Sequence, residues 1–372
     1  MQRYLVLNGP NLNLLGTRDP AIYGFETLDD VEDACRRWGA ELGVEIDVVQ
    51  TNHEGVLIDT LHEARHTHQG VIFNPGAYTH TSYALADAVT AIGVPTVEVH
   101  ISNVEEREPW RRTSLIRPAC VATVYGRGID GYRWAMRHLF HRHEWPFETV
   151  RYADHEDGVM DLRRPKGDGR RVGVVLVHGG FWRHMWTRDT MEGIAIDLAR
   201  RGYLVANVEY RRVGTGGGWP DSVEDVAAAV EHLMGIEPMA RLAVVGHSAG
   251  GHLAVMAGTR TSVTFLPVAL AGVLDIEQAV AEDVGAGAVG AFLDGADPSD
   301  ASPVRVAARV ETVVVHGTDD DRVPISQSRA YAAANPRCEL VELPAVGHFE
   351  FLERSDAAWM RVATLLSERL RL

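Results

Sequence analysis

The stretch that decides the fold of the first half is YLVLNGPNLNLLGTRDPAIYG, residues 4–24. Its apolar start predicts a buried strand, and the polar loop that follows carries asparagines, an arginine and a tyrosine. Short apolar runs separated by helical patterns continue this alternation. The predicted strands are Tyr4–Leu7, Val44–Val49, Gly70–Phe73, Thr96–Val99 and Val121–Val124, and the predicted helices include Leu28–Leu42, Tyr83–Ile92 and Tyr132–Phe140. The pattern indicates an α/β protein with a flavodoxin-like, doubly wound parallel sheet, whose ligands bind beyond the carboxyl ends of the strands.

The chain has 372 residues and is longer than a single hydrophobic core usually supports, so two domains are expected. A polar, proline-bearing segment, HRHEWPFETVRYADHEDG, marks the boundary. We predict a first domain over residues 1–148 and a second over residues 149–372. In the second, apolar runs again alternate with helical patterns, which predicts another α/β fold. These runs are Val172–Val177, Leu204–Val208, Leu242–Val245 and Thr312–Val315.

Composition excludes several classes of function. The formal net charge of −15 at pH 7 argues against a nucleic-acid-binding surface, which needs clustered Lys and Arg. No apolar run reaches the ~18 residues that a membrane span requires, and the N-terminus lacks the features of a secretory signal. Three widely spaced cysteines predict no disulfide framework. We therefore expect a cytoplasmic protein whose partners are small molecules rather than nucleic acid or a membrane.

Three segments at the ends of predicted strands carry groups suited to acid–base chemistry. They are NGPNLNLLGTRDPAIYG (8–24), FNPGAYTHTSYALADA (73–88) and EVHISNVEEREPWRR (98–112). A free tyrosine has a pKa near ~10, so Tyr23 can act as a base only if cations such as Arg18 favour its phenolate. Asn11 and Asn13 could hold a water or donate to an enolate oxygen, and His100 could protonate a leaving hydroxyl. Because Lys166 is the only lysine of the chain, a Schiff-base mechanism in the first half is excluded.

These three segments resemble, in this order, the type II 3-dehydroquinate dehydratases, and the similarity covers the whole first domain. The resemblance implies a flavodoxin-like fold, assembled as trimers that pack into a dodecamer. It also implies a trans elimination of water from 3-dehydroquinate through an enolate, giving 3-dehydroshikimate without a metal or cofactor.

The resemblance assigns roles to matching positions. Tyr23 would remove the C2 proton, and Arg18 would activate it. Asn11 would support the enolate through a water, and His100, oriented by Glu98, would protonate the departing hydroxyl. The residues that would bind the substrate are Asn74, His80, Asp87 and Arg111, together with the backbone of Ile101 and Ser102.

Two other motifs in the first domain have simpler interpretations. The letters HEARH at residues 62–66 spell the H-E-x-x-H of zinc proteases, but the segment is expected on a surface helix and a zinc site needs a third ligand. GRGIDG at residues 126–131 spells G-x-G-x-x-G, yet it ends a domain, where a tight turn into the last helix is expected. We predict neither a metal nor a cofactor.

The second domain carries motifs for nucleophilic catalysis. GHSAG (246–250) lies between an apolar run and a helical segment, the context of a nucleophile elbow that presents Ser248. Upstream, HGGFW (178–182) follows a strand and would supply part of an oxyanion hole. The backbone amides expected in that hole are those of Gly180, Phe181 and Ala249.

The remaining members of a catalytic triad are expected downstream. The segments that carry them are HGTDDDRVP (316–324) and PAVGHFEF (344–351). His348 would take the proton of Ser248, and a buried aspartate would fix its tautomer. The order Ser, Asp, His is that of an α/β-hydrolase. Spacing to the following Val-Pro selects Asp320 for the aspartate, with the adjacent Asp319 and Asp321 as open alternatives.

These motifs resemble the small HGGxW esterases and the kynurenine-formamidase-like branch of the α/β-hydrolases, over roughly residues 150 to 372. The resemblance implies a serine hydrolase for an ester or an amide. The chain is thus predicted to be a bifunctional, homo-oligomeric enzyme, and the fusion suggests an ester of quinate or shikimate as the second substrate. An alternative makes the first domain mainly an oligomerisation scaffold for the hydrolase.

Overall fold

The computed structural model describes residues 2–104, 107–166, 171–306 and 310–371. The chain divides into two compact units, Met1–Glu144 and Trp145–Leu372, and each is described by itself below. This division falls a few residues before the boundary predicted at residue 148. Within the described ranges, no helix is long and apolar enough to cross a membrane.

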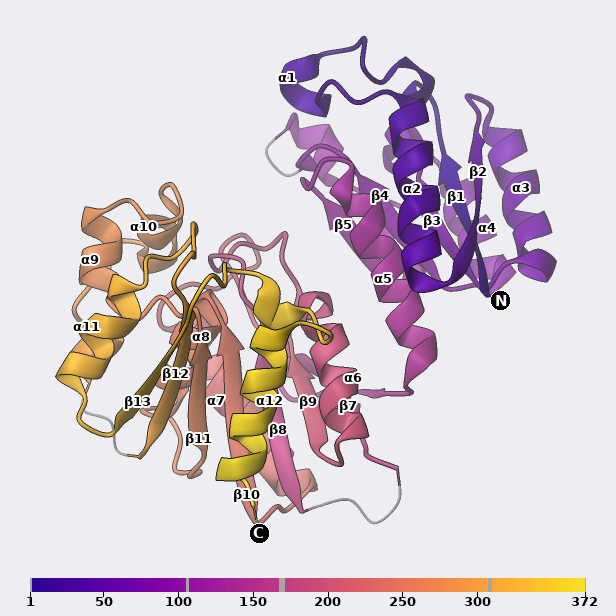
Figure 1. Ribbon diagram of the computed structural model, residues 1–372. Coiled ribbons are helices and arrows are strands. Elements are labelled where there is room, and N and C mark those ends of the chain that lie inside the picture. Colours follow the sequence, from indigo (N-terminus) through magenta and orange to yellow (C-terminus); the bar gives the residue numbers. More distant parts are fainter. Residues whose placement is uncertain (1, 105–106, 167–170, 307–309, 372) are drawn as a thin grey trace. The chain divides into compact units, whose positions relative to one another are not determined.

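The first unit is built on a five-stranded sheet of order β2-β1-β3-β4-β5, in which all neighbours are parallel (Figure 1). This order is that of the flavodoxin-like doubly wound fold, so the predicted fold is confirmed. All five predicted strands are present, with ends that differ by at most two residues. The strands are β1 (Gln2–Asn8), β2 (Val44–Gln50), β3 (Gly70–Asn74), β4 (Thr96–His100) and β5 (Ala122–Tyr125).

Helices cover both faces of this sheet. An apolar cluster joins one face to α2 (Leu28–Leu42) and α5 (Asp130–Glu144), and a second cluster joins the other face to α3 (Glu54–Thr67) and α4 (Tyr83–Ile92). A capping box starts α2: the Thr27 side chain accepts from the Asp30 amide, and the Asp30 carboxylate accepts from the Thr27 amide. Both faces of the sheet are therefore buried, and the loops at the carboxyl ends of the strands are free to carry a site.

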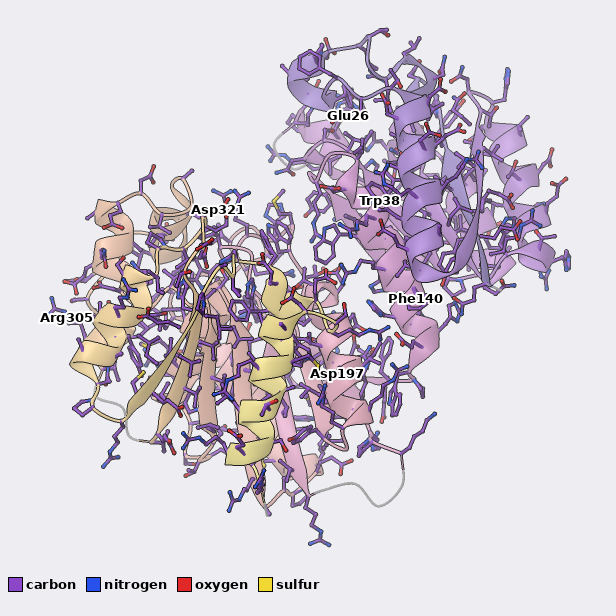
Figure 2. All side chains as sticks on the ribbon, in the orientation of Figure 1. Glu26, Trp38, Phe140, Asp197, Arg305 and Asp321 are labelled. Carbon is purple, nitrogen blue, oxygen red and sulfur yellow. The ribbon has the colours of Figure 1, made fainter. Side chains whose placement is uncertain are left out.

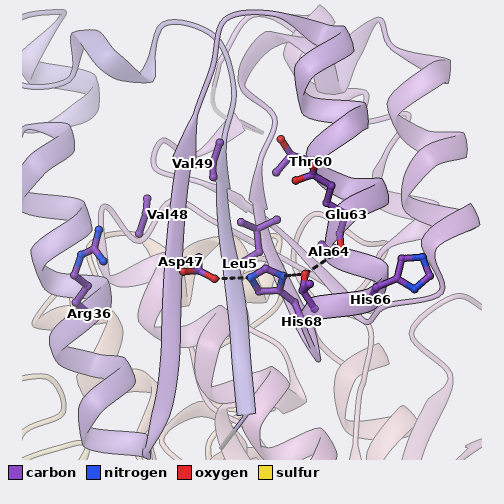
Figure 3. Close-up of a pocket in the computed structure, with 11 residues that line it drawn as sticks. Leu5, Arg36, Asp47, Val48, Val49, Thr60, Glu63, Ala64, His66 and His68 are labelled. Atoms are coloured by element: carbon purple, nitrogen blue, oxygen red, sulfur yellow. Dashed lines mark hydrogen bonds and ion pairs between the residues drawn. The ribbon is translucent and has the colours of Figure 1, made fainter.

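An open groove of about 620 Å³ lies beside the edge strand β2 (Figure 3). There His68 Nε2 lies 2.8 Å from Asp47 Oδ2, and Asp47 also pairs with Arg3 at 2.6 Å. Such charges on an edge strand oppose pairing with another strand. The HEARH segment, residues 62–66, lies on α3 with both histidines exposed. No site residue predicted above lines this groove.

The second unit is built on an eight-stranded sheet of order β13-β12-β11-β10-β8-β9-β7-β6. From β13 to β9 the neighbours are parallel, whereas β7 pairs antiparallel with both β9 and β6. The strands are β6 (Glu148–Arg151), β7 (Val159–Arg163), β8 (Val172–Val177), β9 (Leu204–Val208), β10 (Arg241–His247), β11 (Leu266–Leu270), β12 (Thr312–Gly317) and β13 (Cys338–Leu343).

This sheet is also buried between helices. One apolar cluster contains α6 (Glu192–Arg200) and α12 (Ala357–Arg369), and another contains α7 (Asp221–Ile236) and α8 (Ala249–Ala257). Trp359 of α12 is fully buried and donates to the Asp197 carboxylate of α6 at 2.7 Å; Figure 2 labels Asp197. The shorter helices near the sheet are α9 (Ile276–Ala281), α10 (Ala288–Leu293) and α11 (Ser326–Ala334).

Four strands of the second unit were not predicted from the sequence: β6, β7, β11 and β13. β11 contains Pro267, which lacks an N–H and is typical of turns, yet it pairs with Val244 of β10. β7 contains Asp161 and Arg163, charged residues that are buried here and form ion pairs with Arg188 and Glu192. Neither the strand pairing of Pro267 nor the ion pairs of Asp161 and Arg163 can be predicted from a pattern of apolar runs.

Candidate active sites

Tyr23 lies at the end of the one-turn helix α1 (Pro20–Tyr23), in the loop that follows β1 (Figure 1). Its hydroxyl oxygen accepts hydrogen bonds from two guanidinium groups, Arg18 Nη2 at 3.2 Å and Arg107 Nη1 at 3.0 Å. Both guanidinium carbons also lie near the phenol ring, 4.4 Å and 5.5 Å from its centroid. Two cationic donors on one phenol oxygen stabilise a phenolate, the form that can accept a proton.

A buried carboxylate orients a histidine at the end of β4. His100 Nε2 lies 2.8 Å from Oε1 of the fully buried Glu98. Ser114 Oγ donates to both carboxylate oxygens at 3.0 Å, and Thr79 Oγ1 donates to one of them. Burial alone raises the pKa of Glu98, but these hydrogen bonds and the charge of the imidazole outweigh it and hold the pKa below its ordinary value. The ionised carboxylate therefore orients the imidazole of His100.

The end of β3 places Asn74, and the short helical turn after it places His80. Asn74 Nδ2 donates to the Tyr132 hydroxyl at 2.8 Å, and that hydroxyl donates to Asn8 Oδ1 at 2.7 Å, so a buried chain fixes the amide. His80 Nδ1 lies 2.6 Å from the carbonyl oxygen of Thr113. Burial lowers the pKa of His80 in spite of this hydrogen bond, and the lowered pKa favours the neutral ring.

The loop after β4 is held by the glycine segment 126–131. The Gly126 amide donates to the carbonyl oxygens of His100 and Ser102 at 3.2 Å, and the Gly128 amide donates to that of Ile101 at 3.1 Å. Both glycines have positive φ, so the segment forms the tight turn predicted before α5. Across the described ranges, the amides of Ile101 and Ser102 meet no protein acceptor.

Three further residues were predicted for this site: Asn11, Arg111 and Asp87. Asn11 has a left-handed φ of 66°, and its amide donates to Asn52 Oδ1 at 2.9 Å. Arg111 Nε lies 2.9 Å from the Glu108 carboxylate. Asp87 lies exposed on α4, and in the part of the chain that the structure describes no hydrogen bond or ion pair joins it to the residues above.

Ser248 occupies the turn between β10 and α8, with φ 57° and ψ −120°. A left-handed φ is uncommon for a residue with a side chain and is typical of a nucleophile elbow. Glycines permit this turn. A methyl group at Gly246 would lie 1.9 Å from the carbonyl oxygen of Gly250, and one at Gly250 would lie 2.1 Å from that of Val177. The backbone around Ser248 is therefore held against β8.

His348 lies in the loop after β13, with Nδ1 2.7 Å from Asp320 Oδ2. The other carboxylate oxygen accepts from the amides of Arg322 and Val323, at 2.9 Å and 2.8 Å. Burial raises the pKa of Asp320, but hydrogen bonds from His316 and His348 outweigh it and hold the pKa well below its ordinary value. An ionised carboxylate fixed in this way orients the imidazole.

The neighbours of Asp320 have other surroundings. Asp319 Oδ1 accepts from the Thr318 hydroxyl at 2.8 Å, and the Asp321 side chain is 76% exposed in the loop beyond β12 (Figure 2). Among the described contacts, Asp320 is the one of the three aspartates that reaches His348.

The segment 178–182, which we call the oxyanion loop, closely approaches the elbow. A methyl group at Gly179 would lie 2.8 Å from the carbonyl oxygen of His247 and 2.9 Å from Ser248 Cβ. Glycine is therefore required for this approach. Amides beside a nucleophilic serine can bind an oxyanion when they are otherwise unpaired. Within the described residues, the amides without a protein acceptor include those of Gly180, Phe181 and Ala249.

Comparisons with known proteins identify the first unit. Residues 2–140 match the family model described as "Dehydroquinase class II". A 3-dehydroquinate dehydratase of Marinomonas sp. (strain MWYL1) is 54% identical over 147 residues, which cover 38% of this chain and 98% of that protein. This chain belongs to the class II dehydroquinases. The family predicted from the sequence is confirmed for this first unit, the dehydroquinase unit.

The second unit matches a different family model, described as "BD-FAE", over residues 160–302. A truncated carbohydrate esterase from gut microbiota is 17% identical, with a TM-score of 0.51 over 60% of this chain and 94% of that one. An esterase of Thermogutta terrifontis, Est2, is 22% identical, with a TM-score of 0.50 over 60% of this chain and 91% of that one. At these identities the likeness concerns the fold, and it confirms that this part of the chain has an α/β-hydrolase fold.

One contact in the dehydroquinase unit was not assigned from the sequence. Arg107 donates to Tyr23 from 84 residues away. The segment around it also offers Arg111 and Arg112, and spacing alone does not distinguish the arginine that turns toward a tyrosine on another loop. The available signal for this contact was chemical: a tyrosine that acts as a base needs cations beside its phenol, and Arg18 was the one assigned to that position.

Glu98→Gln tests the buried carboxylate of the dehydroquinase unit. Because the folded-state pKa of Glu98 is lowered, its ionised form stabilises the fold above the ordinary carboxyl pKa of about 4.3, and this stabilisation is lost as the pH falls through the lowered value. We expect the Tm of the dehydroquinase unit to fall less between about pH 6 and about pH 3 in Glu98→Gln than in the wild-type protein. Glu63→Gln, on the exposed face of α3, is the control. Equal slopes for all three proteins would contradict the prediction.

Gly179→Ala tests the approach of the oxyanion loop. The methyl group must displace either the loop or the elbow, so we expect ester hydrolysis to fall by ~10²-fold, the scale for loss of one oxyanion donor. The measurement is kcat on a p-nitrophenyl ester. Gly235→Ala on α7, where an added methyl group meets nothing within 4 Å, should retain wild-type kcat. Wild-type turnover by Gly179→Ala would show that the approach is dispensable.

Proposed function

We propose that residues 1–148 dehydrate 3-dehydroquinate and that residues 149–372 are a serine hydrolase. The observation that carries the first assignment is the Tyr23 hydroxyl, which accepts from two guanidinium groups. The name of the Marinomonas relative, 3-dehydroquinate dehydratase, supports the same reaction for this chain. We also expect a cytoplasmic homo-oligomer, with trimers packed into a dodecamer.

In the proposed dehydration, the Tyr23 phenolate takes the C2 proton of 3-dehydroquinate, and the electron pair moves onto the ketone oxygen as an enolate. The adjacent guanidinium groups stabilise the phenolate, and Asn11 supports the enolate through a water. His100, oriented by Glu98, then protonates the departing hydroxyl. Water leaves and the conjugated product, 3-dehydroshikimate, forms. The groups proposed to hold the substrate are the side chains of Asn74, His80, Asp87 and Arg111 and the amides of Ile101 and Ser102.

In the proposed hydrolysis, Ser248 attacks the carbonyl carbon while His348 takes its proton, and Asp320 holds the imidazole. The leaving group receives that proton, and a water activated by His348 then releases the acyl group. The amides proposed to bind the oxyanion are those of Gly180, Phe181 and Ala249.

We propose esters of quinate or shikimate as substrates of the hydrolase. The support is the fusion itself, because the first domain acts on the same cyclohexane carbon skeleton. Released quinate would supply a route through 3-dehydroquinate, once another enzyme oxidises its ring hydroxyl, and released shikimate would join the same route at the oxidation level below the dehydration product.

Tyr23→Phe tests the dehydration. Without the phenol oxygen no base remains at C2, so we expect kcat on 3-dehydroquinate to fall by ~10²–10⁴-fold. The product is measured by the ultraviolet absorbance of its conjugated enone. Tyr83→Phe, at an exposed tyrosine of α4, should keep wild-type turnover. If wild type and Tyr23→Phe were equal, the first domain would act as an oligomerisation scaffold instead.

Ser248→Ala tests the hydrolase. We expect it to lower hydrolysis of a p-nitrophenyl ester by ~10⁴-fold or more and to abolish labelling by a fluorophosphonate probe. Ser355→Ala, at an exposed serine before α12, is the control. The same proteins are then assayed on acyl and cinnamoyl esters of quinate and shikimate. Turnover of simple esters without release of quinate or shikimate would reject the proposed substrates and retain the reaction class.

A further inference from the structure

Three successive peptide carbonyls of the oxyanion loop each accept a hydrogen bond. The His178 carbonyl accepts from the Tyr210 hydroxyl at 2.9 Å. The Gly179 carbonyl lies 2.8 Å from His178 Nδ1, which must donate because a carbonyl oxygen can only accept. The Gly180 carbonyl accepts from the Arg183 amide at 3.0 Å. Among the described residues, the amides of the same peptide groups, those of Gly179, Gly180 and Phe181, meet no protein acceptor.

Tyr210, the donor to the first carbonyl, and Glu209, which contacts the donor to the second, both lie at the end of β9. Glu209 and Tyr210 directly follow that strand. The Tyr210 ring stacks on the His178 ring, with centroids 4.4 Å apart and planes inclined by 19°. Glu209 Oε1 lies 2.8 Å from His178 Nε2. Both nitrogens of the His178 ring therefore face acceptors, and the ring is fixed in its plane and in its rotation.

Glu209 is suited to hold this ring because it is buried and ionised. Its side chain is 3% exposed. Arg212 lies 3.0 Å from one carboxylate oxygen, and the Arg188 amide donates to the other at 3.1 Å. Burial raises the pKa of Glu209, but Arg212, His178 and Arg188 outweigh it and bring the pKa to about 2. The negative charge opposite His178 is thus maintained at any working pH.

We propose that Glu209 and Tyr210 are positioning residues that clamp the oxyanion loop, so that its amides point at the carbonyl oxygen of the substrate. Glu209 acts through His178 on the Gly179 carbonyl, and Tyr210 acts directly on the His178 carbonyl. The inference rests on the proposed hydrolase function. It deepens that function by naming two residues, remote from the serine in sequence, that set its transition-state binding.

The physical reason is the planarity of the peptide group. In a trans peptide the C=O and the N–H point in opposite directions, so a hydrogen bond that fixes one fixes the other. The Gly179 carbonyl and the Gly180 amide belong to one peptide group, and that amide meets no acceptor among the described residues. Gly180 has φ 103° and gives the backbone little rigidity of its own. An external clamp supplies the preorganisation that oxyanion binding requires.

The test uses Tyr210→Phe in the full chain, because this change removes one oxygen and keeps the stacked ring. On p-nitrophenyl acetate we expect kcat to fall by ~10-fold with KM unchanged, a smaller loss than deletion of an oxyanion donor causes. The Ki of an aliphatic trifluoromethyl ketone, whose adduct with the serine carries an oxyanion, should rise by the same factor. A role limited to folding would change Tm and the titre of active sites, not these two quantities together. Rates are therefore expressed per site labelled by a fluorophosphonate probe.

Two further variants complete the experiment. Tyr331→Phe removes the hydroxyl of another buried tyrosine of the same unit, on α11, and should leave kcat and Ki at wild-type values. Glu209→Gln should lower kcat further than Tyr210→Phe; if it fails to fold, Tyr210→Phe decides alone. Wild-type kcat and Ki in Tyr210→Phe, or a change in KM only, would overturn the clamp. Absence of ester turnover and of Ser248 labelling in the wild-type protein would instead overturn the hydrolase function itself.

Discussion

Parallel strands present their carboxyl ends at one edge of a sheet, and both units of this protein depend on that constraint. In the dehydroquinase unit, Tyr23 lies in the loop after β1, and Asn74 and His100 are the last residues of β3 and β4. In the second unit, the oxyanion loop follows β8, Ser248 follows β10 and His348 lies in the loop after β13. Helices bury both faces of each sheet, so reactive groups gather at this edge rather than on a face.

Buried carboxylates are the second common device. Glu98, Asp320 and Glu209 each accept from several donors that include a histidine nitrogen. In all three the donors outweigh the cost of burial, and the pKa lies below its ordinary value. A charge fixed in this way costs no reorganisation when the neighbouring histidine or peptide is needed. Histidine orientation is thus built into the resting structure of both units.

The cations of the two units have different purposes. Arg18 and Arg107 lie beside a phenol, where positive charge changes the chemistry of the oxygen they contact. Arg188 and Arg212 instead neutralise a buried carboxylate behind the oxyanion loop, so their effect on an ester would be indirect. The chain has a single lysine, so arginine supplies the cations for both purposes. Arginine suits both because its planar guanidinium group carries several N–H donors.

The sequence by itself determined the fold class, the five strands of the first sheet, the family of the first unit and the segments that carry Ser248 and His348, because these follow from local periodicity and contiguous motifs. Only the tertiary structure decided which aspartate contacts His348, since adjacent residues in a turn point in different directions. It alone joined Arg107 to Tyr23 and Glu209 to His178. It also placed Pro267 in a strand and left Asp87 exposed on α4. Each of these depends on contacts between segments far apart in the chain, which no local pattern of residues encodes.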